Sequence, residues 1–518
     1  MGFVSILNDV MGPVMRGPSS SHTAGSYRIG RMARSLFGEC PSSVTFQFDP
    51  EGSYSKVFRE QGADLAFISG ILNWSITDER FLQAREWAEK EGTRFIFDVM
   101  PLEGADHPNT VHISMVSRSG RTLKAVAKSV GGGMVAFTRI GDYAVDLKGK
   151  AYEYIVLADE KEAPQVIDGF VSDQSAIEPP ICHSYKSKKL CQFRAPSPLS
   201  PKKWAYLNNL PGVIQSWSVD PVFSVQKGES LFSSAQEILN IARDKGCSLG
   251  RVGLLYESEI LGMSEADVLK AMEKRLDIME GSLLQGEKEE SIHMQLLQPS
   301  APEVLRAVSA GRVAVGGIHA RAAGRAMAVC HVNNSMGVVC AAPTGGSSGV
   351  IPAVIASMAE EYNLKKSQSV FGLLAASAIG IVIAKRATFA AEIAGCQVEI
   401  GAAGAMAAAA VVEMTGGNAQ QAIDAASIAL QNTMGSVCDL VQGICELPCH
   451  TRNATAASSA FVCADLILGG YHNPIPLDET VDAVLRVGEM LPSELRCTAL
   501  GGIATAPSAL ALPRLRKF

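Results

Sequence analysis

The stretches VFGLLAASAIGIVIA at residues 370–384 and GAAGAMAAAA at residues 401–410 decide the fold of the second half of this chain. The first contains 15 residues, fewer than the ~20 that are needed to cross a bilayer, so we expect a buried helix and no membrane partner. The small residues of the second allow helices to approach each other closely. Together they predict a compact all-helical core with a central apolar helix.

The helical pattern begins just after residue 233. Ser234 and Glu237 have the spacing of a capping box, which marks the start of a helix. A second helix has one apolar face with helical spacing. This face consists of Val268, Met272, Leu276 and Met279. We therefore predict an all-α domain over residues 234–518.

The first 157 residues have a different pattern. Apolar residues alternate in short runs, as in Val44, Phe46 and Phe48 and again around Ile113, and a helical stretch covers residues 80–91. This pattern predicts an α/β domain over residues 1–157, so the whole chain belongs to the α+β class. Between residues 158 and 233 the pattern weakens, and three prolines occur within residues 195–203. We interpret this segment as a linker or a small degenerate module.

The composition excludes several classes of function. The 518 residues are 47% hydrophobic, and 46 Lys plus Arg face 52 Asp plus Glu, for a net charge of −6. This balance provides no positive field for nucleic acid. Twelve cysteines are too few for a disulfide scaffold, and the N-terminal residues lack the basic region of a signal peptide. We expect a cytoplasmic protein.

Several loops are polar enough to bind a ligand. GPSSSHTAG at residues 17–25 offers hydroxyls and backbone amides for an anion, although a serine-rich turn with a helix cap is the simpler interpretation. DHPNT at 106–110 and SVGGG at 129–133 are, taken alone, more typical of turns. APTGGSSG at 342–349 precedes an apolar helix whose amides can face a ligand. This last loop also faintly resembles a pyridoxal-phosphate cup, which is the alternative chemistry.

Four cysteines occur in two segments of the helical domain. Cys396 lies in AGCQVEIG, and Cys438, Cys445 and Cys449 lie in CDLVQGICELPC. Soft thiolates gathered in this way suit zinc or an iron–sulfur cluster. The spacing contains no C-x-x-C pair, so buried structural cysteines explain it equally well.

Taken together and in this order, GPSSSHTAG, DHPNT, SVGGG, APTGGSSG, GCQVEIG and CDLVQGICELPCHTRNA resemble the bacterial iron–sulfur-dependent L-serine dehydratases. The resemblance covers roughly residues 1–157 and 235–510. It implies a β-type α/β domain fused to an all-α α-type catalytic domain. It also implies a lyase of amino-acid metabolism and gluconeogenesis that converts L-serine, a small-molecule substrate, to pyruvate and ammonia. The small-residue helices make a homodimer plausible.

The resemblance implies a cofactor and its ligands. Cys396, Cys438 and Cys449 would hold a [4Fe–4S] cluster, whereas Cys445 stands at an apolar family position and would serve in packing. Three ligands on four irons leave one iron open as a Lewis acid toward the substrate hydroxyl, while a base removes the α-proton. Elimination then yields aminoacrylate, which tautomerises and hydrolyses to pyruvate and ammonia.

The resemblance also carries over site residues one by one. The loop that reaches the active site from the β-type domain would contribute the catalytic residues, and both domains would bind substrate. The predicted catalytic residues are His22, Ser20, Ser21 and Thr23. The predicted substrate-binding residues are Ser19, His107, Asn109, Thr344, Gly346 and Asn453.

This chain departs from the family pattern in places. Gln61 stands where the family usually has a histidine, and an amide cannot take up and release a proton near neutral pH. His22 is the best substitute as the base, followed by His107 and His331. The substitution leaves open a different small β-substituted amino acid or hydroxy acid as substrate, or a non-catalytic amino-acid-binding protein. Residues 152–222 can be an eroded ACT-like domain, which follows the β-type domain in related two-chain enzymes.

Overall fold

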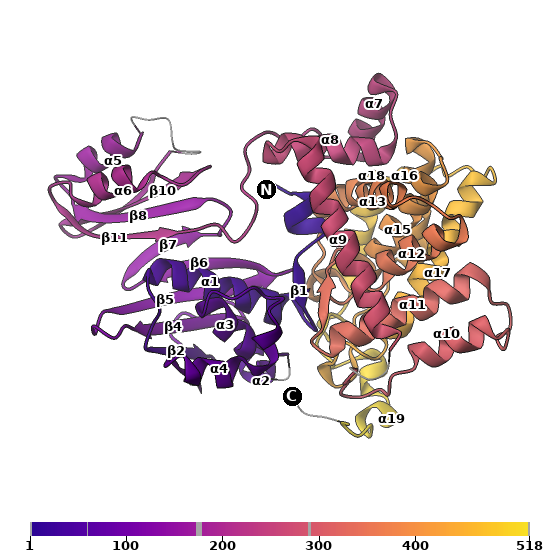
Figure 1. The fold of residues 1–518 in the computed structure, drawn as a ribbon, viewed down its shortest axis with the longest axis horizontal. Coiled ribbons are helices and arrows are strands. Elements are labelled where there is room, and N and C mark those ends of the chain that lie inside the picture. Colours follow the sequence, from indigo (N-terminus) through magenta and orange to yellow (C-terminus); the bar gives the residue numbers. More distant parts are fainter. Residues whose placement is uncertain (1–2, 60, 172–178, 289–291, 516–518) are drawn as a thin grey trace. The chain divides into compact units, whose positions relative to one another are not determined.

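The computed structural model describes residues 3–59, 61–171, 179–288 and 292–515. The chain forms two compact units, which we describe separately (Figure 1). The helical unit comprises Met1–Ser20 and Gly228–Phe518, and the α/β unit comprises Ser21–Lys227. The predicted α+β class is confirmed, with the large sheets in the first part of the chain and the helices in the second. The domain limits at residues 157 and 233 stay predictions.

The α/β unit contains a six-stranded sheet. In β2 (Ser43–Phe48) the side chains of Val44, Phe46 and Phe48 are buried in alternation, as the period-two pattern predicts. Only β2 and β3 pair in parallel, and the other neighbours are antiparallel. The helices α1 (Gly25–Phe37) and α3 (Ala63–Ile71) pack on the sheet and share its apolar core. The strand order is β3 (Arg94–Val99), β2, β4 (Thr110–Val116), β5 (Thr122–Gly131), β6 (Met134–Ile140) and β7 (Tyr143–Leu147).

Three short helical elements accompany the six-stranded sheet. They are α2 (Ser53–Val57), η3 (Glu79–Gln83) and α4 (Ala84–Lys90). The helical stretch predicted over residues 80–91 is therefore a short 3₁₀ segment followed by α4 rather than one helix. Asp78 caps the 3₁₀ segment, because its side chain accepts a hydrogen bond from the N–H of Arg80.

The segment interpreted as a linker or degenerate module is folded in its described residues. Its strands β9, β10 and β11 join β8, which lies almost wholly before residue 158, in a four-stranded antiparallel sheet in the order β11–β8–β10–β9, with one helix after β8 and one before β11. This β-α-β-β-α-β order is that of a ferredoxin-like sheet, which favours the small module over the linker. Its identity as an ACT-like module stays a prediction. The elements are β8 (Tyr152–Asp159), α5 (Ala163–Val171), β9 (Ile181–Tyr185), β10 (Lys188–Ala195), α6 (Pro201–Asn208) and β11 (Val213–Val219).

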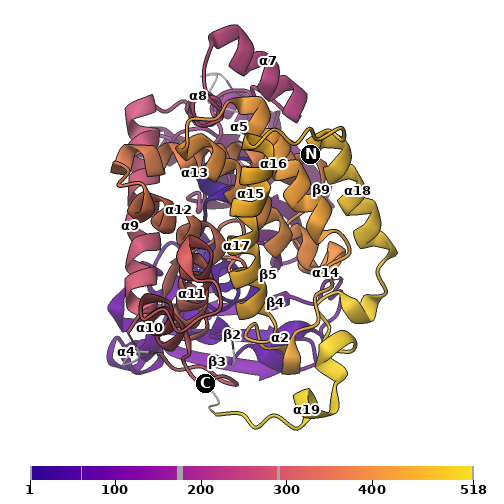
Figure 2. The same cartoon turned by 90° about the vertical axis from the view of Figure 1, so that its right-hand side faces the viewer.

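Two apolar helices, α13 (Lys366–Arg386) and α15 (Ile400–Met414), form the centre of the helical unit. The helix α15 (Ile400–Met414) contains the alanine-rich stretch and packs against α12, α13, α16 and α17, which Figure 2 shows around it. Small residues permit these contacts, as predicted: Gly253 of α8 faces the Leu374 carbonyl of α13, and Gly404 of α15 faces Ala456 of α17. The surrounding helices are α7 (Ala235–Lys245), α8 (Leu249–Leu261), α9 (Glu265–Gly286), α10 (Ala301–Ser309), α11 (Gly317–Asn334), α12 (Val350–Glu361), α13 (Lys366–Arg386), α16 (Ala419–Thr433), α17 (Cys449–Leu468) and α18 (Leu477–Met490).

The predicted helix starts and faces occur in this unit. Ser234 and Glu237 form the capping box of α7, and the four apolar residues of the predicted face are buried in α9. The apolar run at residues 370–384 belongs to a longer helix, because α13 has 21 residues. By length and composition, Lys366–Arg386 and Cys396–Met414 are each able to cross a membrane, but 78% and 89% of their apolar windows are buried in the fold. Core helices of this kind pass the same test.

Residues 3–20, which the sequence analysis placed in the α/β domain, pack with the helices instead. The buried carboxylate of Glu257 accepts hydrogen bonds from Ser5 Oγ at 2.6 Å and from the N–H groups of Ile6 and Leu7 at 2.7 and 2.9 Å. A buried carboxylate needs such donors, so this contact anchors the N-terminal segment. The strand β1 (Val14–Arg16) then pairs antiparallel with β12 (Val338–Cys340).

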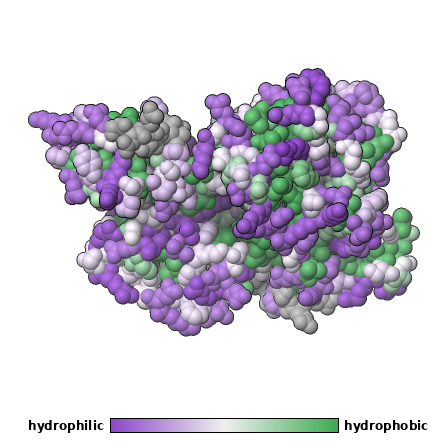
Figure 3. Space-filling view, turned by 45° about the horizontal axis from the view of Figure 1, so that its top comes forward, coloured by the Kyte–Doolittle hydropathy of each residue, from purple (hydrophilic) through white to green (hydrophobic). Residues whose placement is uncertain are grey.

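Polar side chains cover much of the face seen in Figure 3, and apolar side chains reach it in scattered groups. The largest exposed fractions among apolar side chains are at Val315 and Met490, which are 95% and 80% exposed. Isolated exposed apolar residues of this kind are ordinary for globular proteins.

The contact between α9 and α11 provides a test of the packing. A Cβ on Gly286 would lie 2.0 Å from the Ala328 carbonyl oxygen, whereas a Cβ on Gly281 of the same helix would meet nothing within 4 Å. We expect Gly286→Ala to lower the free energy of unfolding by about 1–3 kcal/mol because the helices must separate. Gly281→Ala should raise it by about 0.5–1 kcal/mol, since alanine favours helix. Denaturant unfolding of both variants measures the difference, and equal effects would contradict the packing.

Candidate active site

The three predicted metal ligands are buried thiols on separate segments of the helical unit. Cys396 begins the 3₁₀ turn η5 (Cys396–Val398) after Gly395, whose φ of 76° is a left-handed conformation that suits glycine. Cys449 is the first residue of α17 and follows Pro448. Cys438 lies in an extended segment whose N–H donates to the Leu495 carbonyl at 2.8 Å. All three side chains belong to the buried interior.

These thiols lie near one another. One ligand atom each from Cys396, Glu399 and Cys438 falls within 4.8 Å of the other two. Hydrogen bonds with the thiols of Cys396 and Cys497 and burial raise the pKa of Cys438. The pKa of Cys449 is likewise well above its usual range. The causes are a hydrogen bond with the Cys445 thiol, burial, and the electrostatic effect of Cys396. The structure thus brings Cys396 and Cys438 together with Glu399 and places Cys449 near Cys396, and the metal-binding role of the predicted ligands stays a prediction.

This donor set fits an iron–sulfur cluster chemically. The thiols are free of disulfides, and neighbouring thiols that oppose one another's ionisation become thiolates when a cation is bound among them. A positive charge is also present, since Arg452 Nη1 lies 3.6 Å from the sulfur of Cys396. Soft sulfur ligands with a nearby guanidinium suit a cluster of iron and sulfide.

Arg452 connects the segments that carry these cysteines. Its Nη1 donates to the Val437 carbonyl at 2.7 Å, and its Nη2 lies 2.9 Å from the carboxylate of Asp439. The other oxygen of Asp439 accepts the N–H of Ile503 at 2.8 Å. The guanidinium therefore fixes α17, the turn at Cys396 and the segment around Cys438 relative to one another.

The predicted substrate loop lies directly beside the thiols. Thr344 Oγ1 donates to Glu399 Oε1 at 2.5 Å, and Asn453 Nδ2 donates to the Gly346 carbonyl at 2.8 Å. A Cβ on Gly346 would lie 2.9 Å from Glu399 and 3.3 Å from the sulfur of Cys445, so only glycine fits there without a shift. Thr344, Gly346 and Asn453 are thus brought to one place, and their role in substrate binding stays a prediction.

Ser20 also reaches this loop through its backbone. A Cβ on Gly345 would lie 3.4 Å from the Pro18 carbonyl oxygen and 3.5 Å from the Ser20 nitrogen. Asn333 Nδ2 donates to the same Pro18 carbonyl at 3.3 Å. Ser19 and Ser20 belong to the helical unit, whereas the rest of the predicted catalytic loop belongs to the α/β unit.

In the α/β unit, the residues after Ser20 form a second group. His22 Nε2 lies 2.9 Å from Ser53 Oγ, and its ring packs edge-on against Tyr54. Burial lowers the pKa of His22 to about 4, so the ring is neutral at pH 7. Thr23 Oγ1 donates to the Gln61 carbonyl at 2.9 Å, which places Gln61 beside this loop.

The remaining predicted residues of this unit adjoin the same loop. Ser129 Oγ donates to the Ser21 carbonyl at 2.8 Å, and the Ser129 N–H donates to the Asn109 carbonyl at 3.2 Å. His107 Nδ1 accepts the Asn109 N–H at 3.1 Å. Ser21, His22, Thr23, His107 and Asn109 are therefore brought together within the α/β unit.

Sequence reasoning missed several residues that lie close to Cys396, Cys438 and Cys449. Glu399 is next to two predicted ligands, and burial raises its pKa to about 7. Its position three residues after Cys396 was a usable signal. Cys445, interpreted as packing, contacts the Cys449 thiol. Cys497 pairs its N–H with the Cys438 carbonyl at 2.8 Å, and no motif in the sequence marked it.

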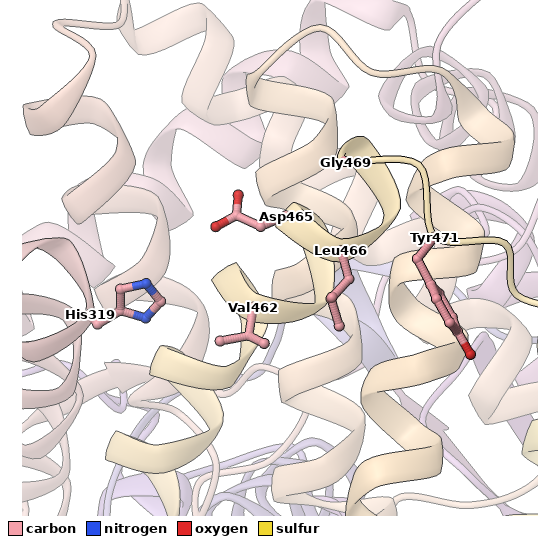
Figure 4. Close-up of a pocket in the computed structure, with 6 residues that line it drawn as sticks. All are labelled: His319, Val462, Asp465, Leu466, Gly469 and Tyr471. Atoms are coloured by element: carbon pink, nitrogen blue, oxygen red, sulfur yellow. The ribbon is translucent and has the colours of Figure 1, made fainter.

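A surface groove lies elsewhere in the helical unit (Figure 4). Val462, Asp465 and Leu466 of α17 line it, and His319 of α11 faces them from the neighbouring helix. None of the predicted site residues lines this groove. The buried cysteines and the loop beside them are therefore a better candidate for the active site than this groove.

These features define a two-unit α+β protein with a thiol-rich candidate metal centre in its helical unit. The profile of the serine dehydratase alpha chain family matches residues 173–504. The "Probable L-serine dehydratase, alpha chain" of Bacillus subtilis is 35% identical over 284 residues, which are 55% of this chain and 95% of that protein. The L-serine dehydratase alpha chain of Peptoniphilus asaccharolyticus is 37% identical over 275 residues, 53% of this chain and 94% of that protein.

The first part of the chain has relatives of its own. The "Probable L-serine dehydratase, beta chain" of Bacillus subtilis is 38% identical over 156 residues, 30% of this chain and 68% of that protein. The chain therefore belongs to the serine dehydratase family, with β-type and α-type parts fused, and it is a lyase.

Proposed function

We propose that this protein is an iron–sulfur-dependent lyase that converts L-serine to pyruvate and ammonia by α,β-elimination. The observation that carries the proposal is the grouping of Cys396, Cys438 and Glu399 beside Thr344, with Cys449 close enough to Cys396 for that thiol to raise its pKa. Family membership supports catalysis over the alternative of a non-catalytic binding protein.

The cofactor would be held by these three thiols. A [4Fe–4S] cluster bound there supplies Lewis acidity, which a hydroxyl leaving group requires. Arg452 balances part of the negative charge of the thiolates from its position beside Cys396.

The residues around the thiols orient substrate and protons. The Asn453 Oδ1 atom is buried and has no hydrogen-bond partner among the described residues, so it is available to accept from an ammonium group. Ser348, whose buried hydroxyl is equally unpartnered among them, lies just before the N-terminus of α12, where the helix dipole favours a carboxylate. Glu399, with a pKa of about 7, can hold or release a proton near neutral pH.

The base of the proposed reaction is His22. Its ring is neutral at pH 7, and a pKa of about 4 makes it a weak base in the structure as it stands. A negative charge near the ring would raise this pKa and strengthen the base. His107 is the second candidate, and its pKa is also lowered by burial.

The test is an anaerobic preparation of the full chain. We expect brown protein with about four iron and four sulfide per chain, a broad visible absorption band and release of pyruvate from L-serine. A well-folded, colourless and iron-free preparation without keto-acid release would contradict the proposal.

A second candidate keeps the cofactor and changes the substrate to another small β-substituted amino acid or hydroxy acid. The buried Oε1 atom of Gln61 has no hydrogen-bond partner among the described residues, and Gln61 lies beside the His22 loop. A screen of such compounds for keto-acid release distinguishes the two. If Gln61→His raises serine turnover strongly, the glutamine only impairs a serine enzyme and the second candidate is wrong.

A further inference from the structure

Three neutral polar side chains form a buried cluster that the proposed chemistry leaves unused. His331 and Asn334 lie at the end of α11, and His450 is the second residue of α17. Their exposed fractions are 0%, 3% and 1%. The ring centres of the two histidines are 5.2 Å apart, and Asn334 Nδ2 lies 2.7 Å from His450 Nε2. We name these three residues the His–Asn cluster.

The surroundings of Asn334 determine where the proton of His450 lies. Asn334 Nδ2 also lies 3.2 Å from the Cys330 carbonyl oxygen and 2.8 Å from that of Cys445. Two acceptors around one amide atom require that atom to be the nitrogen. His450 Nε2 is therefore the acceptor, and the ring carries its proton on Nδ1.

The cluster has hydrogen-bonding capacity that the described residues do not fill. Both ring nitrogens of His331, Nδ1 of His450 and Oδ1 of Asn334 are buried and have no hydrogen-bond partner among them. Native proteins rarely leave such atoms unpaired, because each costs about 1–3 kcal/mol. The cluster therefore requires a guest that both donates and accepts hydrogen bonds.

The same atoms limit the chemistry of the guest. None of the three side chains carries a formal charge in this arrangement, since burial keeps His331 neutral at pH 7 and His450 accepts at Nε2. The nearby carboxylate of Glu446 is satisfied by the N–H groups of Gln295, Leu296 and Leu297. A neutral hydroxyl fits this environment better than a carboxylate or an ammonium group.

The cluster borders the predicted substrate loop. The Cys445 carbonyl binds Asn334, while the Cys445 sulfur lies 3.3 Å from the position of a Cβ on Gly346. Asn453, one helical turn after His450, donates to the Gly346 carbonyl. Cys445 therefore contacts both the His–Asn cluster, through its carbonyl, and the predicted substrate loop, beside its sulfur.

We infer that the His–Asn cluster is a specificity-determining subsite that binds the hydroxyl of the substrate. This inference rests on the proposed function. The hydroxyl oxygen can accept a hydrogen bond from His450 Nδ1, and the hydroxyl proton can be donated to the acceptor nitrogen of His331, which leaves one oxygen lone pair for a Lewis acid. A substrate without a hydroxyl would leave these atoms unpaired, which is a strong basis for discrimination.

The test uses His331→Leu in the anaerobically prepared full chain. Loss of both ring nitrogens should raise the KM for L-serine about tenfold to a hundredfold, with unchanged iron content and melting temperature. His331→Gln, which keeps a neutral donor and acceptor, should restore part of the lost affinity. His319→Leu on the same helix, outside the cluster, is the control and should leave KM unchanged.

The KM values of these variants separate a substrate subsite from a structural cluster. An unchanged KM in His331→Leu, with or without a lower melting temperature, would mean that the cluster holds only structural water and would overturn the inference alone. If His331→Leu does not fold, an unchanged KM in His331→Gln and in Asn334→Leu overturns it in the same way. A wild-type protein that contains no iron and neither binds nor converts L-serine would instead overturn the proposed function.

Discussion

Replacing Cys449 by serine is expected to remove most of the bound iron and to lower lyase activity about a thousandfold. Serine offers a hard hydroxyl in place of a soft thiolate, so it binds iron poorly. Loss of Lewis-acid assistance costs several kcal/mol of transition-state stabilisation, which corresponds to a factor of this size. Iron and sulfide analysis, together with pyruvate release under anaerobic conditions, measures both effects.

The same helix offers a matched control. Cys463 is a fully buried free thiol of α17, and its sulfur lies 4.0 Å from Ser459 Oγ rather than near the other cysteines. Cys463→Ser should keep its iron and its activity and lose only a little stability. Equal iron contents in Cys449→Ser and in the wild type would show that Cys449 is not a ligand.

The contrast between these two cysteines indicates how far sequence reasoning reaches. The resemblance predicts Cys449 as a ligand because it occupies a family motif, and the preceding Pro448 is a second sequence feature that distinguishes it from Cys463. The turn at Pro448 and the helix start that follows are local features, so they could be predicted. Contact with Cys445 and Cys396 depends on how α17 packs against the turn at Cys396, which no local pattern encodes.

The fold shows the same division. The alternation in β2 and the apolar face of α9 predict their elements, because each pattern directly reports one buried face. The run at residues 370–384 predicts a buried helix but not the ends of α13, since charged residues at 366, 385 and 386 continue the helix beyond the apolar run. The ferredoxin-like sheet escaped prediction because its order comes from pairing between distant strands.

The His–Asn cluster is the clearest case of a feature beyond sequence reasoning. The resemblance leaves His331 only as a third candidate base and assigns no role to His450 or Asn334. Asn334 and His450 are 116 residues apart in the chain, so only tertiary structure brings them together. An unpaired buried atom is a property of the whole environment, which the sequence does not display.

Removal of the Arg452 side chain is expected to have the second large effect. Arg452→Leu leaves Asp439, whose side chain is only 5% exposed, without its ionic partner. An unpaired buried carboxylate should lower the free energy of unfolding by about 3 kcal/mol. The loss of the contacts with the Val437 carbonyl and the Cys396 sulfur should also weaken iron retention. Urea unfolding and the rate of iron release to a chelator measure the two effects.

Two further variants separate charge burial from positioning. Arg251 pairs with Glu265, and because both side chains are about 40% exposed, Arg251→Leu should cost less than about 1 kcal/mol. The double variant Arg452→Leu with Asp439→Leu removes the unpaired charge, so it should regain stability relative to Arg452→Leu. It should still release iron faster than the wild type, because the guanidinium contacts with the Val437 carbonyl and the Cys396 sulfur are lost. Wild-type iron retention in the double variant would limit Arg452 to neutralising Asp439.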